Sequence, residues 1–165
     1  MALNEDLEQV AVQERELRLP RLDTKVAWEL GSRLRSIAEQ RGLAVVIDVR
    51  RFGQPLFYTA LEGTTPDNVE WVRRKTNVVA RFHRSSYLIG LKLAAKKETL
   101  TEQQGLALAD YATHGGSFPL TVESAGVVGC VTVSGLPQRA DHELVVEALC
   151  GMLGREYAAL KLGAE

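Results

Sequence analysis

The segment WVRRKTNVVARFHRSS, residues 71–86, contains five Lys or Arg side chains, one His and no acid. On a helix, Trp71 and Lys75 would lie on one side, because residues three and four apart are neighbours. A guanidinium can bind two oxygens of a carboxylate or phosphate at once, and an ammonium attracts them as a point charge. The segment therefore predicts an anion-binding wall that uses Arg73, Lys75 and His83.

The same positive charges have a second explanation. Residues 71–97 hold eight Lys or Arg and no acid, whereas residues 1–19 hold five acids and two arginines. Contacts between helices or between subunits would pair the two segments, and the basic helix would then be an ordinary solvated surface. Exposed ion pairs contribute only about 0–1 kcal/mol each, so stability alone is a weak reason for such a density of charge.

The segment HGGSFPL, residues 114–120, is the second candidate for chemistry. Two consecutive glycines, Gly115 and Gly116, allow a backbone to approach a ligand closely and to present N–H donors. His114 beside them could titrate near neutral pH or bind a metal or a haem iron. The structural alternative is that Gly115 ends a helix and His114 packs at the C-terminus of that helix.

A third candidate is the Asp141–His142 pair within SGLPQRADHE. Asp141 is expected to be the N-cap of the last helix, because its side chain can accept a bond from the first free N–H groups. His142, in the first turn, is expected to face a ligand site or a subunit contact.

Several catalytic signatures are absent from the sequence, including a phosphate-binding loop, C-x-x-C, H-E-x-x-H and G-x-S-x-G. The separations of His83, His114 and His142 match no metal-ligand pattern, so no metal site is predicted. An Asp–His hydrolase or oxidoreductase is the weakest hypothesis, since nothing supplies an activated nucleophile. No catalytic residue is assigned, and the sequence does not decide whether the protein is an enzyme.

These candidates need elements to position them, and the hydrophobic pattern predicts an α+β domain. Strands in adjacent pairs with short links indicate antiparallel hairpins, and the helices come in groups between them. The predicted helices cover 3–18, 24–41, 67–97 with a break near 85–86, a short segment with a capping box at 101–104, and a last helix from 141. The predicted strands cover 43–50, 56–61, 120–124 and 125–135, with 113–119 as a loop.

Composition limits the partners that this chain would have. The 165 residues are 45% hydrophobic with a net charge of −1, which fits one domain and favours neither nucleic acid nor a membrane surface. Residues 1–20 are expected to form a peripheral N-terminal helix, without the apolar run of a secretory signal. Cys130 and Cys150 lie in apolar segments and are expected to be reduced core thiols, which predicts a cytoplasmic protein.

Taken together, WVRRKTNVVARFHRSS, HGGSFPL and GVVGCVTVSGLPQRADHELVVEAL resemble the haem-degrading-domain, or GlcG-like, family, and most closely its intracellular branch with no settled activity. The resemblance covers about 25–153 and implies a profilin-like sandwich with about five antiparallel strands, assembled as a homo-oligomer. Members of the wider group are similar to haem-binding or haem-degrading proteins. The positions that match the branch are Trp71, Arg73, Lys75, Phe82, Ser86, His114, Gly115, Gly116, Pro119, Gly135, Asp141 and His142.

Two functions follow as hypotheses. In the first, a homo-oligomer binds an anionic small molecule, for example haem or a related tetrapyrrole, at the basic helix and the Gly-Gly loop. The residues expected to hold the ligand are Trp71, Arg73, Lys75, His83, Ser86, His114, Gly115, Gly116, Asp141 and His142. In the second, the protein is a non-enzymatic oligomeric interaction module, and the basic helix pairs with acids of a neighbouring subunit.

Overall fold

The computed structural model describes residues 2–165, in which a four-stranded antiparallel sheet is packed between helices. The sheet has the order β2-β1-β4-β3, so β1 and β4 are central. The α+β class with paired antiparallel strands is therefore confirmed. The elements are α1 (Ala2–Glu16), α2 (Thr24–Arg41), β1 (Val46–Arg51), β2 (Gln54–Ala60), α3 (Pro66–Phe82), α4 (Ser86–Lys96), α5 (Leu100–Gln104), β3 (Ser117–Val122), β4 (Gly126–Ser134), α6 (Gln138–Leu153) and α7 (Tyr157–Leu160).

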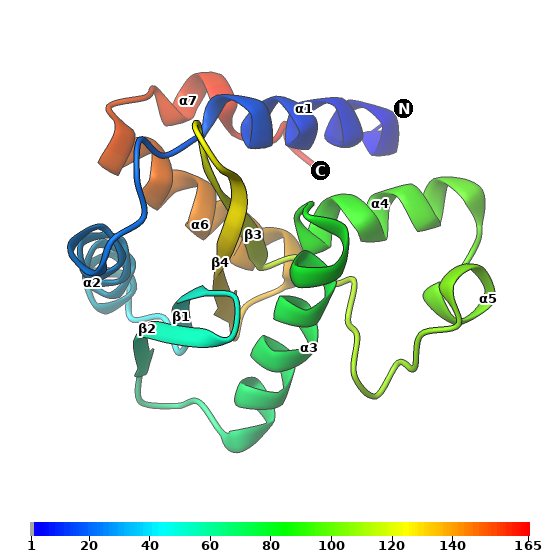
Figure 1. Ribbon diagram of the computed structural model, residues 1–165, viewed down its shortest axis with the longest axis horizontal. Helices are drawn as coiled ribbons and strands as arrows, with labels where there is room; N and C mark the ends of the chain where they lie inside the picture. Colours follow the sequence, from blue (N-terminus) through cyan, green and yellow to red (C-terminus); the bar gives the residue numbers. More distant parts are fainter. Residues whose placement is uncertain (1) are drawn as a thin grey trace.

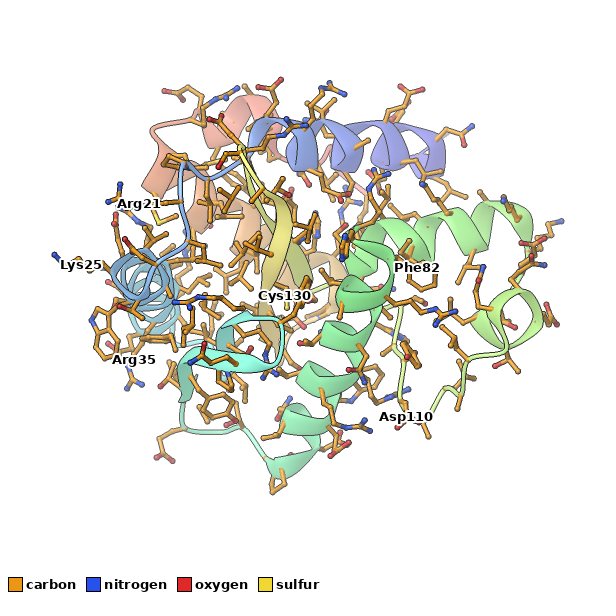
Figure 2. All side chains as sticks on the ribbon, in the orientation of Figure 1. Arg21, Lys25, Arg35, Phe82, Asp110 and Cys130 are labelled. Atoms are coloured by element: carbon orange, nitrogen blue, oxygen red, sulfur yellow. The ribbon has the colours of Figure 1, made fainter. Side chains whose placement is uncertain are left out.

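The helices lie on both sides of the sheet (Figure 1). Helices α2 and α6 cover one face and pack against each other, while α3 covers the opposite face across β4, β3 and β1. Helix α1 packs on α4 and α7, at one end of the sheet. Side chains fill the space between the sheet and the helices on either side (Figure 2).

The helix boundaries follow local signals in the sequence. Asp23 accepts a bond from Val26 N at 2.8 Å and starts α2, and Gly42 ends it in the left-handed conformation, as predicted. The break in the long basic tract is also confirmed, because Ser85 Oγ accepts from Leu88 N at 3.2 Å and starts α4. Helices α3 and α4 are therefore separate elements with different directions.

The two faces of the sheet differ in character because side chains alternate along a strand. Toward α2 and α6 the central strands present Ile47, Val49, Val131 and Val133, which are fully buried in the main hydrophobic cluster. Toward α3, the paired positions are Asp48 opposite Thr132, Arg50 opposite Cys130 and Val46 opposite Ser134. We call these the apolar face and the polar face of the sheet.

The sheet has four strands, as the hydrophobic pattern predicts, which is one fewer than the family resemblance implies. The fifth position is reduced to Leu19, which forms a single parallel bridge to Val122 beside β3. Leu19 N donates to Thr121 O at 2.8 Å, and Glu123 N donates to Leu19 O at 3.1 Å. The chain bends at Pro20 and residues 21–23 form no further bridge, so Leu19 remains an isolated contact and not a strand.

Three boundaries near the candidate residues differ from the prediction. Helix α6 begins at Gln138, so Asp141 lies one turn inside it and is not its N-cap. Strand β3 begins at Ser117, within the predicted loop, because Ser117 pairs with Thr132. Helix α5 is capped by Thr99 instead of Thr101, since Glu102 N donates to Thr99 Oγ1.

Cys130 and Cys150 are buried free thiols, as predicted for core cysteines. Burial raises the pKa of each to about 11, so the thiolate is disfavoured. The cytoplasmic location inferred from these thiols stays a prediction. Among residues 2–165, none of the helices combines the length and apolarity that a bilayer crossing requires.

Candidate functional site

A buried ion pair joins α3 to α6 at the polar face of the sheet. Lys75 Nζ lies 3.0 Å from Asp141 Oδ2 and also donates to Val133 O at 3.2 Å. Only 3% of the Lys75 side chain and 2% of the Asp141 side chain are exposed. Helix α3 places Lys75 because Val72, Val78 and Val79 bury the same side of this helix against the sheet.

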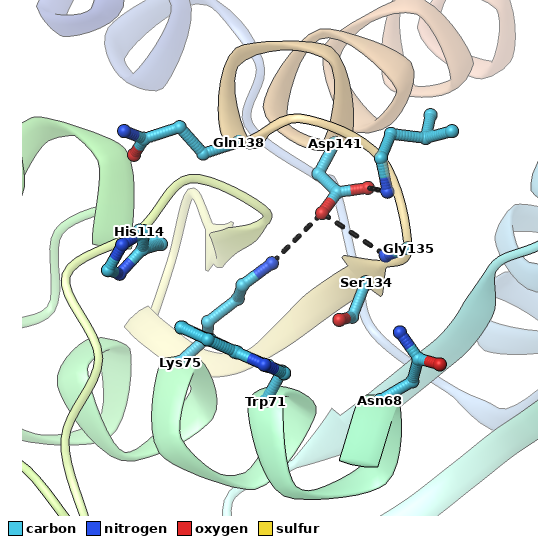
Figure 3. A pocket seen from close by; sticks show the side chains of 9 residues that line it. Asn68, Trp71, Lys75, His114, Ser134, Gly135, Gln138 and Asp141 are labelled. Atoms are coloured by element: carbon cyan, nitrogen blue, oxygen red, sulfur yellow. Dashed lines mark hydrogen bonds and ion pairs between the residues drawn. The ribbon is translucent and has the colours of Figure 1, made fainter. Parts of the chain in front are cut away.

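Asp141 is held by two backbone groups in addition to Lys75. Leu136 N donates to Oδ1 at 2.9 Å and Gly135 N donates to Oδ2 at 3.3 Å (Figure 3). The carboxylate therefore fixes the β4–α6 turn against α3. The helix begins at Gln138, three residues before Asp141, and Pro137 is its N-cap residue.

Burial affects the protonation of this pair in opposite directions. It lowers the pKa of Lys75 below the ordinary lysine value, and the Asp141 carboxylate offsets part of that shift. It raises the pKa of Asp141, against the opposing effects of Lys75 and of the N–H groups of Leu136 and Gly135. Both shifts disfavour the charged forms, so the proton on Lys75 is held less tightly than on a surface lysine.

Trp71 and His114 form the rim beside this pair. Their ring centroids are 4.9 Å apart in an edge-to-face arrangement, and the guanidinium of Arg74 lies 4.7 Å from the Trp71 ring centroid. Partial burial, then the charges of Lys75 and Arg74, lower the pKa of His114 below its ordinary value. These effects favour the neutral form of the His114 imidazole.

Of the two glycines, Gly116 packs beside the ion pair and Gly115 beside Gln138 and Tyr87. A Cβ atom on Gly116, whose φ is +139°, would lie 2.3 Å from Val133 O and 2.7 Å from Lys75 Nζ. Only glycine therefore fits at this position. Gly115 N donates to Gln138 Oε1 at 3.0 Å, so this N–H serves the loop–helix contact.

These groups surround a cavity of about 200 Å³ between α3, the His114 loop and the start of α6 (Figure 3). Three polar residues that the sequence analysis did not select also line it: Asn68, Ser134 and Gln138. The amide oxygen of Asn68 accepts from Thr65 N and that of Gln138 from Gly115 N. Within residues 2–165, the amide nitrogens of Asn68 and Gln138 and the hydroxyl of Ser134 have no hydrogen-bond partner.

The cavity thus brings together Trp71, Lys75, His114 and Asp141, with Gly116 packed against Lys75 and Asp141 and Gly115 against Gln138. The other predicted site residues lie elsewhere. Ser86 Oγ accepts from Ser117 N at 3.1 Å inside the polar face, and exposed His83 stacks on Phe52 at 5.7 Å between ring centroids. His142 is fully buried, with Nε2 2.7 Å from Gln13 Oε1, so the expectation of a site or subunit contact is wrong.

Arg73 points away from the cavity and is paired within the chain. It bonds Glu70 Oε2 at 3.0 Å and Asp110 Oδ1 at 3.1 Å, on the loop beside α3 (Figure 2). Similarly, Arg84 pairs with Glu14 of α1 at 3.1 Å. The ordinary explanation of the basic helix, charges balanced by acids from other segments, therefore accounts for both side chains. Of the three residues in the predicted anion-binding wall, only Lys75 is directed toward the cavity.

One signal for the missed residues was present in the sequence. Asn68 is three residues after Thr65 and completes a capping box that starts α3, in which its amide oxygen reaches back to Thr65 N. Ser134 and Gln138 offered no comparable signal, because they meet Asn68 only through the pairing of β4 with β1 and the turn into α6. Among residues 2–165, no group of three or more His, Cys, Asp or Glu side chains is arranged to hold a metal ion.

Comparison with known proteins places the chain in a family. The model of a family described as "Haem degrading protein HbpS-like" matches residues 22–150. A "UPF0303 protein" of Acidobacterium capsulatum is 64% identical over 162 residues, 98% of each chain. A "UPF0303 protein" of Paraburkholderia phymatum is 58% identical over 162 residues, again 98% of each.

Solved structures share the fold. The Ybr137w protein is 29% identical with a TM-score of 0.83, over 90% of this chain and 87% of that one. HbpS is 22% identical with a TM-score of 0.63, over 84% and 94%. The crystal structure of a "PduOC:Heme Complex" is 15% identical with a TM-score of 0.67, over 78% and 93%. The last two likenesses concern the fold alone. The chain belongs to the family described as HbpS-like, among relatives that carry the name UPF0303 protein.

Proposed function

We propose that the protein binds a small anionic molecule in the cavity between Lys75, Trp71 and His114. The observation that carries this proposal is the position of Lys75. An ammonium has three N–H donors, and two of them are directed to Asp141 and Val133. The third has no acceptor among residues 2–165, and the cavity is the open side.

The remaining lining supports an anion instead of a cation. The free donors are the amide nitrogens of Asn68 and Gln138 and the hydroxyl of Ser134, while the oxygens of both amides are already occupied. The Asp141 carboxylate is neutralised by Lys75 and two backbone N–H groups. A carboxylate or phosphate in the cavity would therefore meet donors and no unpaired negative charge.

The size of the cavity limits the ligand. Sites for drug-sized molecules measure about 300–1,000 Å³, whereas this cavity has about 200 Å³. A haem macrocycle does not fit inside it, although one haem carboxylate would. Of the three histidines, His114 is the one at the rim, and its neutral imidazole suits a metal ligand. Haem remains worth testing because one of the solved structures with this fold is that of a haem complex.

Fluorescence of Trp71 offers a direct test. The chain has two tryptophans, so Trp28→Phe leaves Trp71 as the single reporter. We expect saturable changes with propionate and with inorganic phosphate, and weaker binding in Trp28→Phe/Asn68→Asp. Aspartate at 68 keeps an oxygen for Thr65 N and suits a helix start, but it removes a donor and adds repulsion. Lys92→Gln, an exposed lysine of α4, is the matched control and should bind normally.

Haemin is titrated in parallel, and the Soret band of the mixture is recorded with unaltered protein and with His114→Ala. A saturable shift that His114→Ala abolishes would make haem the ligand. The absence of any saturable response to propionate, phosphate and haemin would refute the proposed function.

A second candidate function is self-association, favoured by the open edge of the sheet. Strand β2 is an edge strand whose outer N–H and C=O groups have no neighbouring strand. Trp28 is 64% exposed and packs on Phe57 of β2, and Tyr58 is 48% exposed. A second copy of the chain that covered this edge would bury both aromatic side chains.

Light scattering after size exclusion tests self-association. Trp28→Lys/Tyr58→Lys should reduce the molar mass in solution, while Leu108→Lys, a change at another exposed apolar residue, should not. A monomer at every protein and salt concentration would reject this candidate.

A further inference from the structure

We propose that Lys75 forms a Schiff base with a small carbonyl compound that also carries an acidic group, such as a 2-oxo acid. The inference rests on the proposed function, because the donors lining the cavity would hold the acidic group while Lys75 Nζ meets the carbonyl carbon. It assigns a covalent activity to the ion pair and names a substrate class.

The geometry around Nζ leaves one direction for attack. A neutral amine has two N–H groups and one lone pair, and Nζ has two acceptors in reach, Asp141 Oδ2 at 3.0 Å and Val133 O at 3.2 Å. Gly116 closes another side, since a Cβ there would lie 2.7 Å from Nζ. The lone pair is therefore directed toward the cavity, along the direction of the third N–H of the ammonium form.

The environment favours the reactive form of the side chain. Burial lowers the pKa of Lys75, so the neutral amine is populated at lower pH than for an ordinary lysine. Desolvated lysines of this kind act as nucleophiles toward carbonyl groups in enzymes. The other lysines lie outside the cavity, so none of them combines these conditions.

The reaction balances with the groups present. The Nζ–C bond forms as the carbonyl π bond breaks, and the resulting carbinolamine loses its oxygen as water to give the imine. The two protons of the amine pass by way of the Asp141 carboxylate, which lines the same cavity, to the departing oxygen. No oxidant, reductant or metal takes part in this condensation.

The experiment uses the unaltered protein with glyoxylate, and with acetaldehyde as the neutral comparison, in the presence of sodium cyanoborohydride. Reduction fixes the imine as a secondary amine that peptide mapping by mass spectrometry locates. We expect one adduct, on the peptide that contains Lys75. We expect glyoxylate to modify Lys75 at least about tenfold faster than acetaldehyde does, because a charge-assisted hydrogen bond to the acid is worth that factor.

Two variants check the assignment. Lys92→Arg should retain the adduct, and Lys75→Arg should lose it, provided that Lys75→Arg still unfolds cooperatively in urea. Peptide mapping of the unaltered protein decides the outcome even if that variant does not fold. Adducts spread over the surface lysines with no preference for Lys75 would overturn the inference, and equal rates with acetaldehyde would overturn the substrate class.

Binding of propionate, measured by Trp71 fluorescence in Trp28→Phe, separates the two proposals, because propionate has an acid but no carbonyl group available to the amine. Propionate binding without an adduct at Lys75 would refute the Schiff-base inference and remain consistent with the proposed function. If the protein neither binds propionate nor forms an adduct at Lys75, both proposals are refuted.

Discussion

The apolar face of the sheet presents Val49, Val131 and Val133 to α2 and α6, whereas the polar face presents Asp48, Thr132 and Ser134 to α3. On the apolar side, stability comes from removal of carbon surface from water, which has no direction. On the polar side, each group depends on a particular partner. Asp48 bonds Arg50 through both oxygens at 2.7 Å, and Thr132 bonds Thr76 and Ser117.

The difference explains where a ligand can be bound. A filled apolar interior has no donor to offer and no space. The polar face ends at Ser134 beside Lys75 and Asp141, where the network is not closed and a cavity remains. The same side is therefore the part of the fold with unused hydrogen-bonding capacity.

The largest effect is expected from breaking the ion pair on one side only. Lys75→Met leaves the Asp141 carboxylate buried without its cation and should lower the free energy of unfolding by about 3–5 kcal/mol. Urea denaturation followed by circular dichroism measures this. Lys75→Met/Asp141→Asn should recover a large part of the loss, because Asn still accepts from Leu136 N. A single variant as stable as the unaltered protein would mean that the pair is solvated.

A truncation on the apolar side should separate stability from binding. Leu149 of α6 is fully buried in the main cluster. Leu149→Ala should cost about 2–5 kcal/mol in the free energy of unfolding, from lost transfer energy and a residual cavity. Propionate affinity of the folded protein, read from Trp71, should stay unchanged. Loss of binding in this variant would show that the two faces are coupled.

The apolar face was the easier part to predict from sequence. Short apolar runs rich in β-branched residues at 43–50 and 125–135 indicate strands, and Asp23, Gly42 and Ser85 mark helix boundaries by local hydrogen bonds. Such signals act within a few residues. They locate elements without stating which elements meet.

The cavity depends on contacts between distant segments. Lys75 and Asp141 are 66 residues apart. Helical spacing places Lys75 on the same side of the helix as Trp71, but nothing local indicates that this side meets Asp141. Charge density therefore predicted a wall of several cations, while the fold selects one of them and pairs Arg73 with Asp110. Likewise, Asp141 and His142 are adjacent and were both predicted to face a site. They point in different directions, because α6 turns Asp141 toward Lys75 and His142 into the core.

His142 provides a pH-dependent comparison with the polar face. It packs against Tyr87 and Phe118, and burial lowers its pKa to about 3. The unfolded chain binds a proton on this imidazole below about pH 6.5, and the folded chain does not until about pH 3. Stability should therefore fall as pH falls through this window, with a slope of at most about 1.4 kcal/mol per pH unit from this group.

The control for this prediction is His142→Gln, which cannot titrate and keeps an amide near Gln13. Urea unfolding at pH 7, 6, 5 and 4 should give a shallower decline for the variant than for the unaltered protein. Parallel declines in the two proteins would show that His142 is protonated in the folded state.

The smallest effect is expected at Arg73, which is the sharpest test of which cation faces a ligand. Its guanidinium is solvent-exposed and bonds Glu70 and Asp110 on the outer side of α3. Water and salt screen such pairs, so Arg73→Gln should leave the urea midpoint and the propionate affinity unchanged. Asn68→Asp, on the inner side of the same helix, should weaken binding strongly at equal stability. If Arg73→Gln weakened binding as much as Asn68→Asp does, the anion would be held by the basic surface of α3 as a whole, and the cavity around Lys75 would lose its special role.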